Sequence, residues 1–241
     1  MPGFQASDSL KGGIAQRTAL MIGNSDGIGL GMTKRLLSAG WDVRGISRSD
    51  SPIRDTGYQH RVADVRDRRY PELIEAFLQD GPVDHCSYFA GIGELLSPGD
   101  MRGEVEIIEV NLLGMVRTAA AVVPHMLRNG KGHFMGVSSM ADELLSAEAP
   151  SYHASKAGFS NYLEGLALAL KPRGVQVTNV RFGFVDTKMA KGDVKPFMMR
   201  VEKAVDHLEA CIRKKPVRYS APKIAIPLIK LRRLMMAFGA A

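Results

Sequence analysis

Short apolar runs and longer amphipathic stretches alternate along this chain. The run Thr18–Ile22 is almost wholly apolar, which is typical of a strand covered on both faces. A helical pattern follows over Gly27–Ser38, with Met32 and Leu36 on one face, and Gly40 is placed to end that helix. The same criteria predict strands at Asp42–Ser47, His60–Ala63, His85–Phe89, Gly132–Val137 and Val175–Arg181, and helices at Tyr70–Leu78, Gly103–Leu127 and Tyr152–Leu170.

Strand and helix repeated in this order predict right-handed crossovers and a parallel sheet with helices on both faces. We therefore expect an α/β, doubly wound, Rossmann-type fold in a single domain. The predicted catalytic domain covers residues 17–221, with a substrate loop at 187–200 and a last strand within Pro216–Ser220. An N-terminal extension covers 1–16, and a basic, apolar C-terminal segment covers 222–241.

Composition agrees with a folded globular protein. The chain has 241 residues, 45% of them hydrophobic and 24% charged, enough to bury a core. Cys86 and Cys211 are its only cysteines, which excludes a disulfide scaffold. We find no apolar run of membrane-spanning length and no signal-peptide core near the N-terminus, and we predict a soluble, cytoplasmic protein.

The net charge of +7 is concentrated near the C-terminus. Residues 188–241 hold 13 basic and 4 acidic side chains, whereas residues 1–187 hold 19 basic and 21 acidic ones. A near-neutral body with a basic end, lacking interleaved aromatic residues, argues against nucleic-acid binding. The apolar helix pattern at Ile224–Phe238 contains Pro227 and several cations. It could lie on an anionic membrane surface, but packing on a partner subunit or on the protein's own body is the favoured interpretation.

A glycine-rich turn follows the first predicted strand and opens the first predicted helix. It reads Gly23-Asn24-Ser25-Asp26-Gly27-Ile28-Gly29. Glycines let a pyrophosphate approach the backbone, and a helix N-terminus attracts its charge. A glycine turn without a ligand is the alternative, but the strand–turn–helix context favours dinucleotide binding.

The glycine spacing and the sequence Tyr152-His153-Ala154-Ser155-Lys156 carry a resemblance to a known family. Further motifs follow in the family's order: Asp64-Val65, Ala90-Gly91, Asn111, Ser138-Ser139, Gly183 and Thr187. Over residues 16–190 the chain resembles the short-chain dehydrogenase/reductase family. As an ordered set these motifs are specific, although each piece alone is weak.

Tyr152 and Lys156 are four residues apart and therefore share one helix face. We expect the lysine ammonium and an oxidised nicotinamide to lower the pKa of Tyr152, which makes it an acid/base group. The resemblance implies that Lys156 also bonds the nicotinamide ribose, that Ser139 holds the substrate oxygen, and that Asn111 kinks its helix and holds a proton-relaying water.

The predicted second strand ends in Ile46-Ser47-Arg48, without a carboxylate for a ribose 2′-hydroxyl. Arg48 suits a 2′-phosphate, which favours NADP(H), whereas Asp26 stands where NADP-dependent relatives often have a basic residue, so NAD(H) stays open. The expected cofactor-binding residues are Gly23, Ser25, Asp26, Gly27, Ile28, Gly29, Ser47, Arg48, Asp64, Val65, Ala90, Gly91, Tyr152, Lys156, Gly183, Val185 and Thr187. We predict no metal site.

Several positions depart from the family pattern. Tyr88-Phe89 replaces two amides that usually tie the central strands together, and Met140-Ala141-Asp142 replaces a small residue and glycine after the serines. Ile22 and Phe182 are further departures. These changes concern local stabilisation and leave the predicted catalytic set intact.

The expected substrate walls are Leu144–Pro150 and the stretch from Thr187 to Val201, whose Met and Phe residues suit either an apolar pocket or the core. Lys188, Lys191 and Lys195 could attract an anionic substrate, but a solvated surface is the plainer interpretation.

The predicted function is NADP(H)-dependent interconversion of a carbonyl and a secondary alcohol on an apolar or acyl substrate. The alternative is a non-catalytic nucleotide-binding protein of the same fold. The resemblance implies a homodimer or homotetramer formed through the two long helices.

Overall fold

Seven parallel strands form one sheet in the computed structural model, which describes residues 16–190 and 195–237. Their order is β3-β2-β1-β4-β5-β6-β7, so the direction of winding reverses between β1 and β4. The strands are β1 (Thr18–Ile22), β2 (Asp42–Ser47), β3 (Tyr58–Val62), β4 (His85–Tyr88), β5 (Gly132–Ser139), β6 (Val175–Phe182) and β7 (Arg218–Ala221). In such sheets ligands bind beyond the carboxyl ends of the strands, near the reversal.

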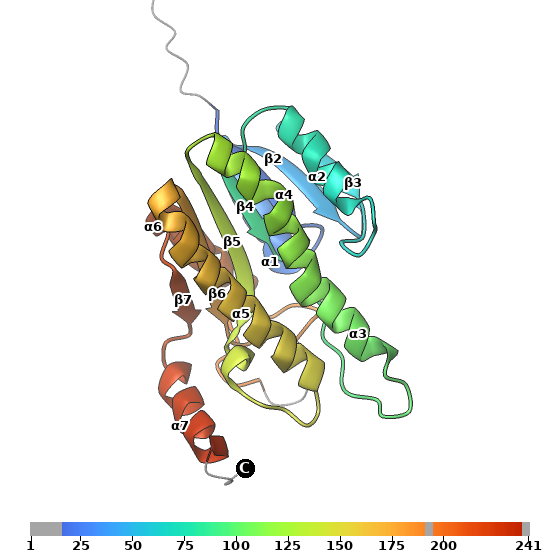
Figure 1. Ribbon diagram of the computed structural model, residues 1–241, viewed down its shortest axis with the longest axis vertical. Coiled ribbons are helices and arrows are strands. Elements are labelled where there is room, and N and C mark those ends of the chain that lie inside the picture. Colours follow the sequence, from blue (N-terminus) through green and yellow to red (C-terminus); the bar gives the residue numbers. More distant parts are fainter. Residues whose placement is uncertain (1–15, 191–194, 238–241) are drawn as a thin grey trace, which may run out of the picture.

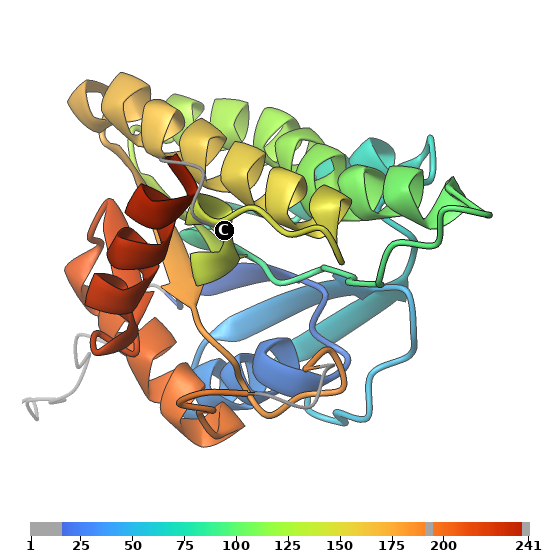
Figure 2. The same ribbon diagram turned by 90° about the horizontal axis from the view of Figure 1, so that it is seen from below.

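Helices cover both faces of this sheet, as the alternating pattern predicted. One face carries α2 (Tyr70–Gln79), α4 (Gly114–Arg128) and α5 (Pro150–Leu170), and the other carries α1 (Gly27–Ser38) and α6 (Val201–Lys214) (Figures 1 and 2). The doubly wound, single-domain prediction is confirmed.

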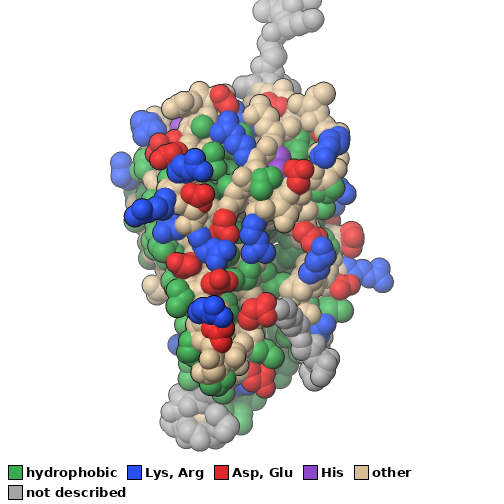
Figure 3. Space-filling model, turned by 90° about the vertical axis from the view of Figure 1, so that its right-hand side faces the viewer, with side chains coloured by type: hydrophobic (Ala, Val, Ile, Leu, Met, Phe, Trp, Pro, Cys, Tyr) green, Lys and Arg blue, Asp and Glu red, His purple; other side chains and the backbone are tan. Residues whose placement is uncertain are grey.

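Each face buries its own hydrophobic cluster. Tyr88, Phe134 and Phe159 lie in the cluster under α2, α4 and α5, and Met32 and Leu208 lie in the cluster under α1 and α6. At the surface over α2 and β3, basic and acidic side chains lie next to one another (Figure 3).

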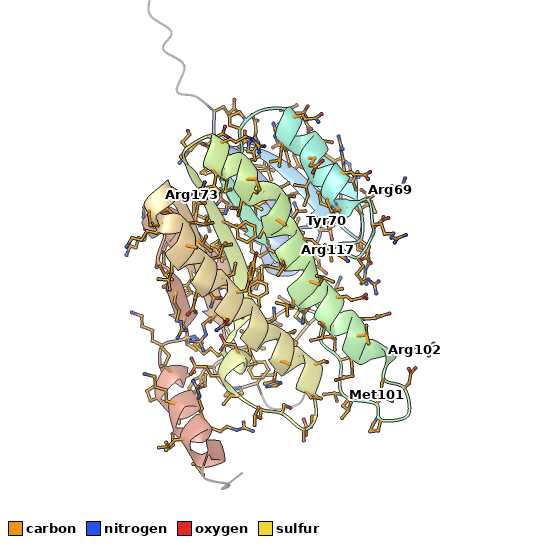
Figure 4. All side chains as sticks on the ribbon, viewed as in Figure 1. Arg69, Tyr70, Met101, Arg102, Arg117 and Arg173 are labelled. Atoms are coloured by element: carbon orange, nitrogen blue, oxygen red, sulfur yellow. The ribbon has the colours of Figure 1, made fainter. Side chains whose placement is uncertain are left out.

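The long helix predicted at Gly103–Leu127 consists of three parts. These are α3 (Arg102–Ile108), a π-helical segment η1 (Glu109–Leu113) and α4. Arg102 and Arg117 mark its course in Figure 4. The 27 residues Arg102–Arg128 are long and apolar enough to span a bilayer, but half of the apolar window is buried inside the protein. This segment is therefore a helix that packs on the sheet, and its apolar residues serve the core.

The C-terminal third differs most from prediction. α6 was not predicted. It starts at Val201, two residues after Met199, which is buried, whereas Phe197 and Met198 are exposed. The last strand is β7, shifted slightly toward the C-terminus, and α7 (Ala225–Ala237) follows it. The predicted extension over 1–16 lies outside the described residues except for residue 16, as do Lys191 and Phe238.

A chain of buried polar side chains crosses β4, β5 and β6 beneath α1 and α6. His85 Nδ1 lies 3.2 Å from His133 Nδ1, Ser87 Oγ lies 2.6 Å from His85 Nε2, and Thr178 Oγ1 lies 2.9 Å from His133 Nε2. Burial lowers the pKa of His85 to about 3 and lowers that of His133 well below its usual value, with Lys215 adding to both shifts. Both imidazoles are therefore neutral in the folded protein at neutral pH.

This buried pair predicts acid-sensitive stability. In the unfolded chain each histidine takes up a proton below about pH 6.5, whereas in the folded protein it resists protonation, so the free energy of unfolding falls as the pH falls. Between about pH 7 and pH 5 the expected loss is about 2 kcal/mol per histidine. Urea unfolding of the wild type and of His133→Gln measures it, and an equal pH slope in both proteins would contradict the assignment.

Candidate active site

The predicted catalytic residues come together at the carboxyl edge of the sheet. Ser139 is the last residue of β5, Tyr152 and Lys156 lie on the first turns of α5, and Asn111 lies in the middle of η1. Their elements are far apart in the sequence, and the parallel register of β4, β5 and β6 brings them to one edge.

Lys156 is a buried amine next to Tyr152. Its Nζ donates to the Val137 carbonyl at 3.2 Å and lies 5.8 Å from the centre of the Tyr152 ring and 5.1 Å from that of Phe159. Burial lowers the pKa of Lys156 to about 8, opposed by the carboxylate of Asp142. The amine thus titrates close to neutral pH, where small changes in its surroundings alter its charge.

The Tyr152 phenol has the opposite tendency from the one expected. Burial raises its pKa, a hydrogen bond with Ser139 opposes the rise, and the Asp142 carboxylate adds to it. Desolvation of the phenolate is thus the largest influence on this pKa in the chain by itself. The lowering expected from the lysine ammonium together with an oxidised nicotinamide stays a prediction. Ser139 also accepts a hydrogen bond from the Ala141 amide at 3.1 Å, which orients its hydroxyl.

Asn111 locks the loop that follows β4. Its Oδ1 accepts from the Ile92 amide at 2.8 Å, and its Nδ2 donates to the Ile92 carbonyl at 2.9 Å and to Ser155 Oγ at 3.0 Å. The Ser155 hydroxyl donates in turn to the Tyr152 carbonyl at 2.7 Å. The π-helical segment displaces Asn111 from the regular helix, and through it the β4 loop is tied to the turn of α5 that carries Tyr152.

The glycine turn fits closely against the neighbouring loop. A Cβ atom on residue 23 would lie 2.4 Å from the Ala90 nitrogen, and one on residue 29 would lie 2.3 Å from the Gly23 carbonyl oxygen. Gly23 also has φ of +80°, which favours glycine. Ser25 and Ile28 are half-buried in this turn. The glycines therefore keep side chains away from the backbone before α1, as the approach of a pyrophosphate to the helix N-terminus requires.

Asp26 is the N-cap of α1. Its carboxylate accepts from the Gly27 amide at 2.7 Å and pairs with Lys188 at 2.7 Å, and that pairing holds the pKa of Asp26 below its usual value. Thr187 faces Gly27, since a Cβ there would lie 3.3 Å from Thr187 Cγ2. The segment after β6 thus lies against the glycine turn.

Gly91 leaves a space between Asn111 and Lys156. A Cβ on residue 91 would lie 3.4 Å from Asn111 Oδ1, 3.4 Å from Met189 Cε and 3.8 Å from Lys156 Nζ. A cleared space that contains an amine and an amide oxygen suits the ribose and amide groups of a nicotinamide nucleotide. The residues present therefore fit such a cofactor.

The end of β2 rests on a polar network. Ser47 Oγ lies 2.7 Å from His60 Nε2 and donates to Asn24 Oδ1 at 3.4 Å, while Asn24 Nδ2 donates to Tyr58 Oη at 2.9 Å. Gly45 makes room, because a Cβ there would lie 2.5 Å from the Tyr58 hydroxyl. Arg48 follows, exposed to solvent.

Four further residues predicted to bind the cofactor lie at or near the same edge of the sheet: Asp64, Val65, Gly183 and Val185. The Asp64 carboxylate accepts from both Arg66 Nε at 3.0 Å and Arg66 Nη2 at 2.8 Å, and Arg66 lowers its pKa. Val65 is buried in the core. Gly183 donates to the Ala221 carbonyl at 2.9 Å, and Val185 forms a bridge with Met199.

A buried ion pair behind the site was missed by the sequence analysis. Arg181, at the end of β6, donates from Nε and Nη2 to the two Asp142 oxygens, at 2.6 Å each, and pairs with Glu143 at 2.6 Å. The Arg181 and Asp142 side chains are only 6% and 3% exposed. Ser160 of α5 donates to Asp142 at 2.5 Å, so this pair ties the end of β5 to the helix of Tyr152.

Asn24 and Ser155 were also missed as functional supports, because amides and serines in turns and helices are common. Tyr88, a noted departure, has an assignable purpose: its hydroxyl donates to the Val110 carbonyl at 2.5 Å, next to Asn111. It thus ties β4 to the π-helical segment η1, which contains Val110.

Only some of the apolar residues in the expected substrate walls are exposed. Leu145, Met189, Phe197 and Met198 are exposed near this edge, whereas Met199 belongs to the core. Lys188 pairs with Asp26, and Lys195 is half-buried.

The sequence of this chain is similar to those of known oxidoreductases. The sequence model of the short chain dehydrogenase family matches residues 17–196. An uncharacterized oxidoreductase of Myxococcus xanthus is 28% identical over 89% of this chain and 91% of its own length. The 3-oxoacyl-acyl-carrier-protein reductase of Vibrio cholerae is 31% identical over 73% and 76%. The cis-4-hydroxycyclohexanecarboxylate dehydrogenase of Sinomonas cyclohexanicum is 30% identical over 74% and 77%.

Solved structures share the fold. A short-chain dehydrogenase from Burkholderia cenocepacia in complex with NADP superposes with a TM-score of 0.82 at 22% identity, over 92% of this chain and 97% of that chain. One from Sphingobium yanoikuyae in complex with NADPH gives a TM-score of 0.76 at 23% identity, over 92% and 95%.

Proposed function

Since the chain belongs to the short-chain dehydrogenase/reductase family and is an NAD(P)-dependent oxidoreductase, we propose that it interconverts a carbonyl and a secondary alcohol on an apolar substrate, with NADP(H) preferred. The observation that supports this most strongly is the convergence of Ser139, Tyr152 and Lys156 at the carboxyl edge of the sheet. Solved relatives in complex with NADP or NADPH support a nicotinamide cofactor.

In the proposed reduction, Tyr152 gives its phenolic proton to the substrate carbonyl oxygen, and Ser139 donates a hydrogen bond to that oxygen. The chemistry that a nicotinamide would supply when bound is hydride for the carbonyl carbon, so that this hydride and the Tyr152 proton would together give a neutral alcohol. The raised pKa of Tyr152 keeps the phenol protonated at neutral pH, which favours reduction in this state. Oxidation needs the phenolate, and a positively charged Lys156 would stabilise it.

Lys156 and Asn111 have supporting roles in this proposal. Lys156 would hold the nicotinamide ribose in the space beside Gly91 and adjust the charge around Tyr152. Asn111 fixes the Ile92 backbone and, through Ser155, the turn of α5 that carries Tyr152. The proton-relaying water expected at Asn111 stays a prediction.

The glycine turn and the end of β2 would hold the rest of the cofactor. The pyrophosphate would lie at the N-terminus of α1, near Gly23, Gly27 and Gly29, with Ser25, Asp26, Ile28 and Thr187 around it. Ser47 and Arg48 would face the adenosine ribose, with Asp64 and Val65 nearby. Ala90, Gly91, Gly183 and Val185 would line the nicotinamide end.

The NADP preference rests on Arg48, whose guanidinium is exposed at the end of β2 and can pair with a 2′-phosphate. Asp26 does not weigh against this, because its charge is paired with Lys188. Arg48→Ala is expected to raise the KM for NADPH about tenfold or more and to leave that for NADH within about twofold. Steady-state kinetics with both cofactors measures this, with Arg54→Ala as control. A variant with unchanged NADPH kinetics would refute the preference.

An apolar substrate is proposed because Leu145, Met189, Phe197 and Met198 are exposed near the Tyr152 edge. The named activities of two relatives, on a cyclohexane ring and on an acyl chain, are in keeping with this class.

A homo-oligomer is proposed as well. An apolar groove of about 490 Å³ runs between α3 and α5, lined by Val105, Ile108, Pro150 and Ala154 among others, and such a surface suits contact with a second subunit.

A cytoplasmic location is proposed as well, since Cys86 and Cys211 are free thiols and reducing compartments keep thiols free.

The decisive experiment is a panel of apolar ketones, aldehydes and acyl thioesters incubated with NADPH and with NADH. Loss of reduced-nicotinamide absorbance with at least one carbonyl compound, faster with NADPH, is the expected result. Cofactor binding without turnover across the panel would instead support the non-catalytic alternative.

A further inference from the structure

α7 presents an apolar stripe to solvent. Leu228, Leu231 and Met235 recur at helical spacing, Ile224 in the turn just before the helix continues the same row, and Leu234 lies beside them. Each is 47–64% exposed. Five large apolar side chains in one continuous stripe are more than scattered surface residues, and such stripes mark interaction sites.

The opposite side of α7 attaches it to the body. Ala225, Ile226 and Ile229 are half-buried, and Arg233 Nη1 lies 3.9 Å from Glu143 Oε2 near η2 (Met140–Glu143). Figures 1 and 2 show α7 beyond β7 at the border of the molecule, outside both helical layers. The stripe therefore points away from the body. Of the two favoured expectations, packing of the apolar face on the protein's own body is wrong for these residues, and packing on a partner subunit stays a prediction.

The charges around the stripe have one sign. The segment 222–241 contains Lys223, Lys230, Arg232 and Arg233 and no aspartate or glutamate. At 100° per residue, Arg232 lies on one border of the stripe and Lys230 on the other. An apolar stripe bordered by cations is typical of helices that lie in a membrane interface.

A second copy of α7 is a poor occupant for this stripe. Two such helices packed face to face would bring Lys230 and Arg232 of both copies together without a carboxylate on either helix, which costs free energy. An anionic lipid surface offers phosphate groups to the cations and acyl chains to the leucines.

We propose that α7 binds the surface of an anionic phospholipid bilayer, with the stripe Ile224–Leu228–Leu231–Leu234–Met235 inserted among the lipids. β7 ends at Ala221 on the same edge of the sheet as Ser139, because the strands are parallel. The bound protein would thus hold its site edge close to the bilayer, where apolar substrates concentrate.

Co-sedimentation of the full chain with vesicles tests this. Vesicles of phosphatidylcholine mixed with phosphatidylglycerol should bind the protein about tenfold or more tightly than pure phosphatidylcholine, and salt should weaken the binding. Leu228→Glu combined with Leu231→Glu should reduce binding at least about tenfold. Met101→Glu, at an exposed apolar position just before α3, is the matched control and should bind normally.

Binding of NADPH, followed by fluorescence, verifies that each variant is folded, independently of whether the proposed reductase activity is found. Wild-type protein that stays in the supernatant with both vesicle types would overturn the proposal. So would unchanged vesicle binding of the Leu228/Leu231 variant together with a loss of oligomeric mass by light scattering, which would assign the stripe to a subunit contact.

Discussion

Replacing Tyr152 by phenylalanine is expected to lower kcat for carbonyl reduction about 10²- to 10⁴-fold, while NADPH binding persists. The proposed proton comes from the phenolic hydroxyl, and phenylalanine removes that hydroxyl while retaining the ring beside Lys156. The ring also packs beside Gly93, since a Cβ there would lie 3.3 Å from Tyr152 Cδ2. The loop after β4 therefore keeps its support in the variant, and the loss can be assigned to chemistry.

Tyr162 provides the matched control. It lies on the same helix, is partly buried, and packs against the core away from Ser139 and Lys156. Tyr162→Phe should change kcat by less than about twofold, because surface or core-edge hydroxyls contribute little to the reaction barrier. Single-turnover measurements at saturating NADPH separate chemistry from product release. Tyr152→Phe with wild-type single-turnover rates would refute the assignment of the proton donor.

Most strands of the fold could be predicted because they are short runs that alternate with helical patterns, although β1 is almost wholly apolar whereas β2 contains Asp42 and Arg44. β1 and β2 match their predicted bounds, and β5 and β6 end only two residues and one residue later than predicted. α6 also has apolar positions at helical spacing, at Ala204, Val205, Leu208 and Cys211, with charged residues between them. This amphipathic pattern predicts a helix, and the sequence analysis missed it. The π-helical segment left no periodic signal, because one extra residue in a turn shifts the pattern only locally.

The site, too, has residues that the sequence predicts and residues that it does not. Tyr152 and Lys156 are close in sequence, so their helical spacing alone places them together, and the family order of motifs adds Ser139 and Asn111. Arg181 and Asp142 lie 39 residues apart. Their pairing depends on the β5–β6 register, in which Arg181 stands opposite Ser138. Such a register cannot be read from apolar patterning where both faces of the strands are buried.

The second large expected effect concerns this buried pair. Arg181→Met should lower the free energy of unfolding by about 3 to 5 kcal/mol, because it leaves the Asp142 carboxylate buried without its guanidinium partner. The Glu143 carboxylate loses the same partner. Chemical denaturation at neutral pH measures the change. Arg102→Met is the control: Arg102 makes a similar two-point contact with Asp100, but at the exposed start of α3 (Figure 4), and its replacement should leave stability unchanged.

A double variant distinguishes a buried charge from a general packing loss. Arg181→Met combined with Asp142→Leu removes both charges, so it should be more stable than Arg181→Met alone, since an apolar pair avoids the desolvation of an unpaired carboxylate. Asp142 also accepts from Ser160 on the helix that carries Tyr152 and Lys156. The double variant should therefore regain stability but show a lowered kcat, because α5 loses the Ser160 hydrogen bond to Asp142. A double variant as unstable as the sum of its single variants would show that the pair is not energetically coupled.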